Sequence, residues 1–192
     1  MSGQRQLLVD ASVFITLAEI DALDGLEALD GGLVVPSAVR REVSDDPAKT
    51  QLERLLAAGT VTEVDWFEWA EDREVVGEWV AMATYLGTER DTVVETIDGQ
   101  QALTDGDVAL LCLVQHMNDT LMLTDDKPLR KVCKSQSIPV SGSIAVLVQS
   151  VESGRYTATK AKQKLYAMDE VGARLSASLV KRAEKLIDDA AD

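Results

Sequence analysis

Four acidic residues lie far apart in the sequence but hold similar places relative to short apolar runs. Asp10 closes the run Leu-Leu-Val-Asp, and Asp126 follows a second apolar run at Leu-Thr-Asp-Asp. Glu42 lies two turns into a helix predicted after a third run, and Asp107 begins a predicted helix behind a glycine. In open α/β sheets, functional groups gather beyond the carboxyl ends of the strands. We therefore expect these four carboxylates to meet at one end of a sheet.

A cluster of carboxylates needs compensation, because two like charges about 4 Å apart repel by roughly 4 kcal/mol at an effective dielectric constant of 20. Either protons are taken up, which raises the pKa of the acids, or a divalent cation binds. Oxygen ligands favour Mg²⁺ or Mn²⁺. The single histidine, His116, lies within an apolar segment, and the sequence has no Cys-His pair or Gly-x-Ser-x-Gly motif. Carboxylates that hold Mg²⁺ or Mn²⁺ are typical of phosphodiester hydrolysis, so this chemistry is the first hypothesis.

Individually, each of these signals is weak. An aspartate at a strand end is often only a helix cap. Ser12 adds to the set, because its hydroxyl lies at the start of the helix after Asp10 and could bond a carboxylate or a phosphate. The combination, more than any one acid, supports the hypothesis.

Strands and helices are predicted to alternate along most of the chain. The predicted strands are 7–10, 33–35, 61–64, 121–124 and 138–140, and the predicted helices between them are 11–20, one from Ser37, 48–58, 66–86, one from Asp107, and 127–134. This order predicts an α/β sandwich, in which right-handed crossovers build a mostly parallel sheet covered by helices on both faces.

The alternation of strands and helices stops after Gly142. Helices are predicted there at 143–150, 157–168 and 176–189, with no strand between them. We therefore divide the chain into a domain at 1–145 and a helical C-terminal extension at 146–192. Apolar residues in the last helix recur at spacings of three and four, so one face must be covered. Packing on its own domain is the simpler interpretation, and a homodimer or partner surface is the alternative.

Composition limits the class of protein. The 192 residues suit one domain with an appendage, and no window is long and apolar enough for a membrane span, so we expect a cytoplasmic protein without a membrane partner. Cys112 and Cys133 lie in apolar segments and have no metal-ligand spacing, which indicates structural thiols. The net charge of −14 opposes phosphate binding at low salt, but molar salt shortens the Debye length to about 3 Å. The aspartate-rich, lysine-poor composition resembles that of halophilic archaeal proteins, and an acidic mesophilic protein is the alternative.

The motifs around these acids resemble those of PIN-domain proteins, the family of metal-dependent ribonucleases that includes VapC toxins of toxin–antitoxin pairs. The matching stretches, in the family's order, are LLVDASVFI, VVPSAVRREV, TDGDVALLCLV and LMLTDDKPLRKV. The segment from IPVSGSIAVL to the last helix resembles a prokaryotic subgroup with extra C-terminal helices. The resemblance covers most of the chain, and residues 66–101 match least.

The resemblance implies a three-layer α/β/α sandwich and a Mg²⁺- or Mn²⁺-dependent endoribonuclease with RNA as substrate and an antitoxin as a further partner. It implies that the catalytic and metal-binding acids are Asp10, Glu42, Asp107 and Asp126, supported by Ser12 and Thr124. Many relatives carry a glutamate where this chain has Asp107, which keeps the charge but shortens the reach by one methylene group. Whether Asp105 or Asp107, and Asp125 or Asp126, is the ligand is left open, as is the identity of the general base.

Two other stretches have alternative interpretations. Trp66, Trp69, Val76, Trp79 and Val80 fall on roughly one helical face and could stack on bases, although a core or a dimer seam is the simpler interpretation. Basic residues next to the acidic positions could contact RNA phosphates, or could be solvated helix faces. These candidates are Arg40, Arg41, Lys127 and Arg130, with Lys131 and Lys134 nearby.

Two other functions compete with the nuclease. A non-catalytic PIN-like module could bind RNA or protein, but it would have little reason to keep four acids. A phosphoacceptor receiver domain also has an acidic pocket, but it places a lysine just beyond the last strand, where Ile-Pro-Val-Ser-Gly-Ser offers none. Within the nuclease hypothesis, a toxin and a housekeeping RNA-processing enzyme are both open.

Overall fold

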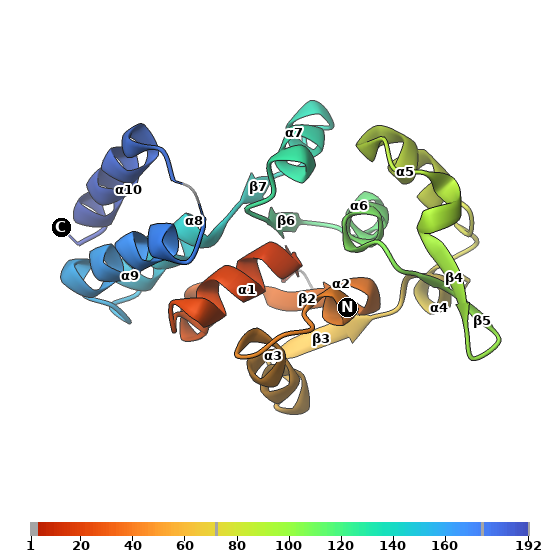
Figure 1. Cartoon of the computed structure of the whole chain (residues 1–192), viewed down its shortest axis with the longest axis horizontal. Helices are drawn as coiled ribbons and strands as arrows, with labels where there is room; N and C mark the ends of the chain where they lie inside the picture. Colours follow the sequence, from red (N-terminus) through yellow and green to blue (C-terminus); the bar gives the residue numbers. More distant parts are fainter. Residues whose placement is uncertain (1–3, 72, 174, 192) are drawn as a thin grey trace.

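A parallel sheet forms the centre of the protein (Figure 1). The computed structural model describes residues 4–71, 73–173 and 175–191. In that part of the chain the sheet has five strands in the order β3-β2-β1-β6-β7, and every neighbouring pair is parallel. The strands are β1 (Gln6–Val9), β2 (Gly32–Pro36), β3 (Val61–Val64), β6 (Thr120–Leu123) and β7 (Val140–Ser141). The predicted parallel sheet is thus confirmed, with the last strand two residues later than predicted.

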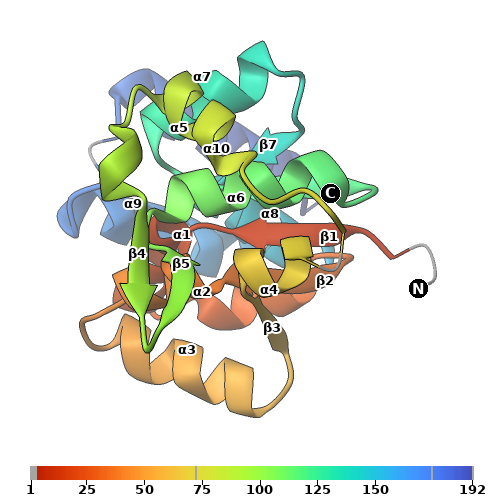
Figure 2. The same cartoon turned by 90° about the vertical axis from the view of Figure 1, so that its right-hand side faces the viewer.

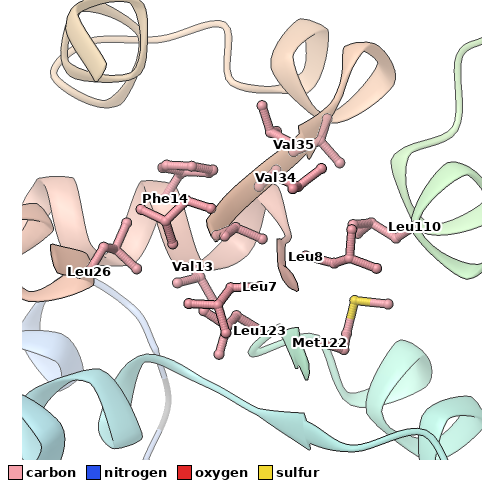
Figure 3. Close-up of a cluster of buried hydrophobic side chains, with 14 of the residues drawn as sticks. Leu7, Leu8, Val13, Phe14, Leu26, Val34, Val35, Leu110, Met122 and Leu123 are labelled. Carbon is pink, nitrogen blue, oxygen red and sulfur yellow. The ribbon is translucent and has the colours of Figure 1, made fainter. Parts of the chain in front are cut away.

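The central strand β1 is apolar throughout because helices cover both faces of the sheet. Leu7, Leu8 and Val9 are at most 1% exposed. Successive side chains of a strand point to opposite faces, and Figure 3 shows Leu7 on the side of Val13 and Leu8 on the side of Leu110. A strand buried on both faces shows no polar alternation, which is why the sequence reads as a continuous apolar run.

Two layers of helices enclose the sheet. On one face, α1 (Ala11–Glu19) packs against α3 (Ala48–Ala57) and α8 (Ser143–Glu152). On the other face, α6 (Gly106–His116) packs against α2 (Ser37–Glu42) and α5 (Trp79–Leu86), and Figure 1 shows α1 and α6 on opposite sides of the strands. This is the predicted three-layer α/β/α sandwich. Cys112 and Cys133 are buried free thiols within it.

The C-terminal part is helical, as predicted. After α7 (Lys127–Ser135) and β7, the chain forms α8, α9 (Ala158–Glu170) and α10 (Ala177–Asp189). The last helix packs on α9 and α8 and buries Ala183 and Ile187, so it covers one apolar face within its own chain. The division of the chain at 145/146 stays a prediction, and this boundary falls within α8.

None of the helices in the described ranges is long and apolar enough to cross a bilayer.

The least well predicted region lies between β3 and α6. The predicted helix 66–86 is wrong as a single element, because α4 (Trp66–Glu71) and α5 are separate helices. Positive φ angles at Glu74 (58°) and Gly77 (102°) interrupt the helical path between them. The single apolar helix face expected there therefore does not exist: Trp66 is 1% exposed, whereas Val76 is 56% exposed.

A hairpin in the same region was not predicted. Strands β4 (Val94–Ile97) and β5 (Gln100–Leu103) pair antiparallel and lie side by side in Figure 2. They are joined by Asp98 and Gly99, with φ angles of 51° and 83°. An Asp-Gly pair in this conformation is a common two-residue hairpin turn, so the sequence did contain a local signal for the hairpin. Short 3₁₀ segments at Leu23–Ala28 (η1) and Arg90–Thr92 (η2) complete the fold.

Candidate active site

The site begins where β1 and β6 end. Asp10 follows β1 and is 4% exposed. Its Oδ2 accepts hydrogen bonds from Ser12 Oγ at 2.5 Å and from Thr124 Oγ1 at 2.6 Å. Burial raises the pKa of the Asp10 carboxyl, and the two hydroxyl donors oppose that rise. The chain thus holds one buried carboxylate in a fixed position by two hydroxyl groups from different strand ends.

The two aspartates after β6 point to different partners. Asp126 caps α7, where its Oδ1 accepts from the Leu129 N–H at 2.8 Å, and its own N–H donates to Thr124 Oγ1 at 3.0 Å. Asp125 instead accepts from the backbone N–H and hydroxyl of Ser143, at 3.0 and 2.5 Å. Its carboxylate therefore anchors the start of α8, while its backbone N–H donates to Ser12 Oγ at 3.0 Å. This geometry favours Asp126 over Asp125 as the ligand, and that assignment stays a prediction.

Glu42 reaches the site from the end of α2. Its Oε1 accepts a hydrogen bond from the Gly106 N–H at 2.7 Å. A Cβ atom at position 106 would lie 2.7–2.9 Å from the Glu42 carboxylate, which is closer than real Cβ contacts. Asp105 caps α6, because its Oδ1 accepts from the Val108 N–H at 2.9 Å. Asp107 lies one residue beyond the glycine, and its carboxylate takes no part in this cap.

Asp107 experiences the charge of all its acidic neighbours. Burial raises the pKa of Asp107 to about 8, and the carboxylates around it contribute to the rise, in decreasing order Asp10, Asp126, Asp105 and Glu42. The pKa of Glu42 is raised to about 7, chiefly by partial desolvation of its carboxyl, against the opposing hydrogen bond from Gly106. Burial of a carboxyl group and repulsion from neighbouring carboxylates both raise its pKa. The charges of Asp10, Asp126 and Glu42, the other acids predicted for the site, therefore all act on Asp107.

The donor set suits a hard divalent cation. The acids and hydroxyl groups described above offer oxygen ligands, which favour Mg²⁺ and Mn²⁺. Among the residues that the structure describes, however, no three acidic, histidine or cysteine side chains already converge closely enough to hold an ion. Glu42 is turned to a backbone N–H, and so is Asp126. The residues fit the ion in chemistry and charge, and side-chain rotation would have to complete the fit.

We expect Gly106→Ala to change metal affinity much more than stability. The new methyl group would displace the Glu42 carboxylate from the Gly106 N–H, whereas the mobile end of a half-exposed side chain can move at small cost to the fold. Groups that orient metal ligands typically change metal affinity or activity by about 10–100-fold when they are altered. Calorimetric titration with Mn²⁺ and a thermal melt measure the two effects. Gly99→Ala in the distant hairpin turn is the control: its φ of 83° strains an alanine, so stability should fall without a change in Mn²⁺ affinity.

The basic residues of α2 have partners within the chain. Arg40 forms ion pairs with Glu53 and Glu63, at 3.0 and 2.6 Å. Arg41 donates a hydrogen bond to the Leu103 carbonyl oxygen. Their predicted contact with RNA stays a prediction, and the ion pairs of Arg40 would compete with it.

The basic residues of α7 differ from one another. Arg130 donates to the carbonyl oxygens of Thr124 and Ser141, at 2.7 and 2.6 Å, and so joins the ends of β6 and β7. Lys127 is exposed at the start of α7, next to Asp126. Of these two candidates, Lys127 is exposed, whereas Arg130 is half-buried.

Sequence reasoning missed two residues that shape the site. Ser143 holds the Asp125 carboxylate, and Gly142 leaves the space for it, since a Cβ there would lie 2.4 Å from Asp125 Oδ1. The local signal was the Ser-Gly-Ser sequence ahead of an apolar helix, a pattern of a helix start. The sequence could not show that Asp125 is the hydrogen-bond partner of Ser143, because the two residues lie 18 positions apart.

A comparison with family models identifies the family of this chain. A family model, DUF3368, described as a PIN domain, matches residues 6–94 and 71–189, two overlapping segments that together span most of the chain. A search of curated proteins gives no significant match. Beyond its fold, therefore, the chain carries this family's sequence pattern from β1 to α10, and it belongs to the PIN-domain family DUF3368.

Proposed function

We propose that this protein is a metal-dependent endoribonuclease that hydrolyses RNA phosphodiester bonds. One observation carries the proposal: the Asp10 carboxyl, 4% exposed at the end of β1, accepts from the hydroxyls of Ser12 and Thr124, and Thr124 Oγ1 in turn accepts from the Asp126 N–H. The pKa of Asp107, raised to about 8 by burial and by the carboxylates around it, agrees with a gathering of acids at this point. Ionised carboxylates at the carboxyl ends of β1 and β6 would repel one another, and a divalent cation would relieve that repulsion. PIN domains are in general nucleases, and this agrees with the proposal.

The residues that would hold Mg²⁺ or Mn²⁺ are Asp10, Glu42, Asp107 and Asp126. A bound divalent cation would lower the pKa of a coordinated water molecule and would stabilise the negative charge on the leaving oxygen. The chain does the positioning: the hydroxyls of Ser12 and Thr124 fix the Asp10 carboxylate. Glu42 and Asp107 are the candidates for orienting the attacking water.

The proposal is tested by RNA cleavage with and without divalent ions. Purified protein is incubated with structured and unstructured RNA in Mg²⁺, in Mn²⁺ or in EDTA, at low and at molar KCl. We expect cleavage in either metal ion, none in EDTA, and recovery when Mn²⁺ is restored. Cleavage that persists in EDTA would contradict the metal dependence. Binding of RNA without cleavage under every condition would favour the non-catalytic module instead.

The two salt conditions test the predicted habitat. The net charge of −14 repels RNA at long range in dilute buffer, and molar salt removes this repulsion. We therefore propose a halophilic origin, for which cleavage should be faster at molar KCl than at low salt. The opposite order would favour the acidic mesophilic alternative.

The biological role is a narrower proposal. A VapC-like toxin should stop growth when it is expressed alone, and a small antitoxin gene should adjoin its own. A housekeeping RNA-processing enzyme should do neither. Cytoplasmic location, an antitoxin partner and a homodimer stay predictions, and size-exclusion chromatography with light scattering would test the dimer.

A further inference from the structure

A groove runs from the acidic site to the last helix. It has a volume of about 770 Å³, within the range of roughly 300–1,000 Å³ that ligand pockets occupy. At one end it is lined by Ser12, Asp125 and Asp126. From there it passes between α7 and α10, which rise on the same side of α8 in Figure 1. The groove therefore reaches the edge of the proposed site at Ser12 and Asp126.

Three helices each present one face to this groove. Residues 127, 130 and 134 of α7 recur at spacings of three and four, as do residues 179, 182 and 186 of α10. Side chains at such spacings lie on the same side of a helix. Ile144 and Val148 of α8 form the floor. Helices thus form most of the groove, and residues between the helices, such as Gly142 and Leu175, complete it.

The charge in the groove is opposite to that of the whole protein. Lys127, Lys134 and Arg182 line it and are exposed, although the chain carries a net charge of −14. Within the described residues, no carboxylate lies within ion-pair distance of these three groups. The described acids that line the groove are Asp125 and Asp126, both at the end next to the site. Cations are thus concentrated along the path that leads away from the acids.

The remaining wall is aliphatic. Leu179 and Leu186 are 41% and 44% exposed, and both line the groove together with Met168 and Leu175. An apolar wall beside separated cations suits a ligand with flat apolar parts and a regular series of negative charges. Lys127 and Lys134 are two helical turns, about 10 Å, apart along α7, so they can contact different phosphates of one strand.

We infer that this groove binds the single-stranded RNA that flanks the bond to be cut. The inference rests on the proposed function, because that function places the scissile phosphate at the acidic end. Lys127, Lys134 and Arg182 contact backbone phosphates, and the aliphatic wall of α8 and α10 covers the faces of the bases. An acidic protein segment would match the cations, but it would gain nothing from ending at Asp125 and Asp126. The C-terminal helices thereby become part of the substrate site.

The test compares two double variants of equal charge change. In Lys134→Glu/Arg182→Glu, both substitutions are in the groove. In the control Lys131→Glu/Lys181→Glu, they are on the same two helices, at exposed positions that do not line it. The probe is a fluorescein-labelled oligouridylate of about 12 nucleotides, within the range of single-strand site sizes. Its binding is measured by anisotropy in EDTA, so that cleavage plays no part, and thermal melts confirm that both variants fold.

We expect the groove variant to bind the oligonucleotide about tenfold or more weakly. The slope of log affinity against log salt should fall by about 0.7 for each lost phosphate contact, hence by about 1.4. The control variant should stay within about twofold of the unchanged protein. Equal weakening of both variants would reveal only a general charge effect and would overturn the inference. So would unchanged binding by the groove variant, in which case the groove is a surface for a protein.

Cleavage assays separate this inference from the proposed function. If the unchanged protein cuts RNA and the groove variant cuts and binds as well as the control, the inference fails and the nuclease stands. If no RNA is cut but the groove variant alone loses binding, the groove is an RNA-binding site and the nuclease proposal fails. In the expected case, the groove variant loses activity through KM on a long RNA. It cuts a short RNA, which contains the scissile bond but does not extend into the groove, as well as the control does.

Discussion

Asp10→Asn is expected to lower the rate of RNA cleavage by about 10³-fold or more, equivalent to at least about 4 kcal/mol of transition-state stabilisation, and to leave the fold intact. An asparagine oxygen can accept the hydrogen bonds that Ser12 and Thr124 now donate to Asp10 Oδ2. The side chain is only 4% exposed, so the substitution also removes the cost of a buried negative charge. Geometry is kept while the charge that would attract a divalent cation is lost.

Single-turnover cleavage in Mn²⁺ and a thermal melt in EDTA measure the two sides of this prediction. Asp125→Asn is the matched control, because the same chemical change then occurs on a carboxylate that faces Ser143 and the start of α8. We expect that control to keep most of its cleavage activity. Asp10→Ala, by contrast, should lose stability as well as activity, since it leaves the hydroxyls of Ser12 and Thr124 without their acceptor. Cleavage by Asp10→Asn at the rate of the unchanged protein would rule out the proposed site.

The elements that could be predicted best are those whose sequence pattern reflects burial. The run from Leu7 to Val9 is apolar because both faces of β1 are covered, and such a run bounded by a polar residue predicts a central parallel strand. The same reasoning applies to β2, β3 and β6, each within one residue of its predicted bounds. Once the strands are parallel and helices alternate with them, the acids that follow the strands must lie at one end of the sheet.

The details that could not be predicted depend on contacts across long sequence separations. Asp105 and Asp107 have the same chemistry and are two residues apart, so the sequence could not decide between them. In the structure, Asp105 is used by the α6 cap and Asp107 is left beside the other carboxylates. The hydrogen bond from the Gly106 N–H to Glu42 joins residues that are 64 positions apart in the sequence, and no local sequence pattern predicts it. For the hairpin β4–β5 the failure was different: the Asp98-Gly99 turn signal was present, but the flanking strands are too polar to stand out.

In metal-free protein, Asp107 should make stability fall as the pH rises. The pKa of Asp107 is about 8 in the folded chain, against 3.8 for an ordinary aspartate. Between these two values the folded state therefore binds more protons than the unfolded state, and stability decreases with increasing pH. The contribution is fully present below about pH 4 and is lost as the pH passes through 8. Glu42, whose pKa is raised to about 7, changes stability in the same direction.

Asp107→Asn should remove most of this pH dependence. One pKa unit corresponds to about 1.4 kcal/mol, and the acids share their repulsion, so we expect about half of the full shift, roughly 2–3 kcal/mol of added stability at pH 8. For a chain of this size that is on the order of 5–10 °C in the melting temperature. The measurement is a series of melts in EDTA between pH 5 and 8.5, with Glu95→Gln in the exposed strand β4 as a charge-removal control.

Added Mn²⁺ should reverse the order of the two proteins at pH 8. A ligand that binds only the folded state raises its stability, so the unchanged protein should gain more from Mn²⁺ than Asp107→Asn does. The control Glu95→Gln should follow the unchanged protein throughout. Equal pH slopes for all three proteins in EDTA would show that Asp107 is not coupled to its acidic neighbours. Equal gains from Mn²⁺ would show that the cation binds elsewhere, and the two results together would leave the acids of β1, α2, α6 and α7 without a common function.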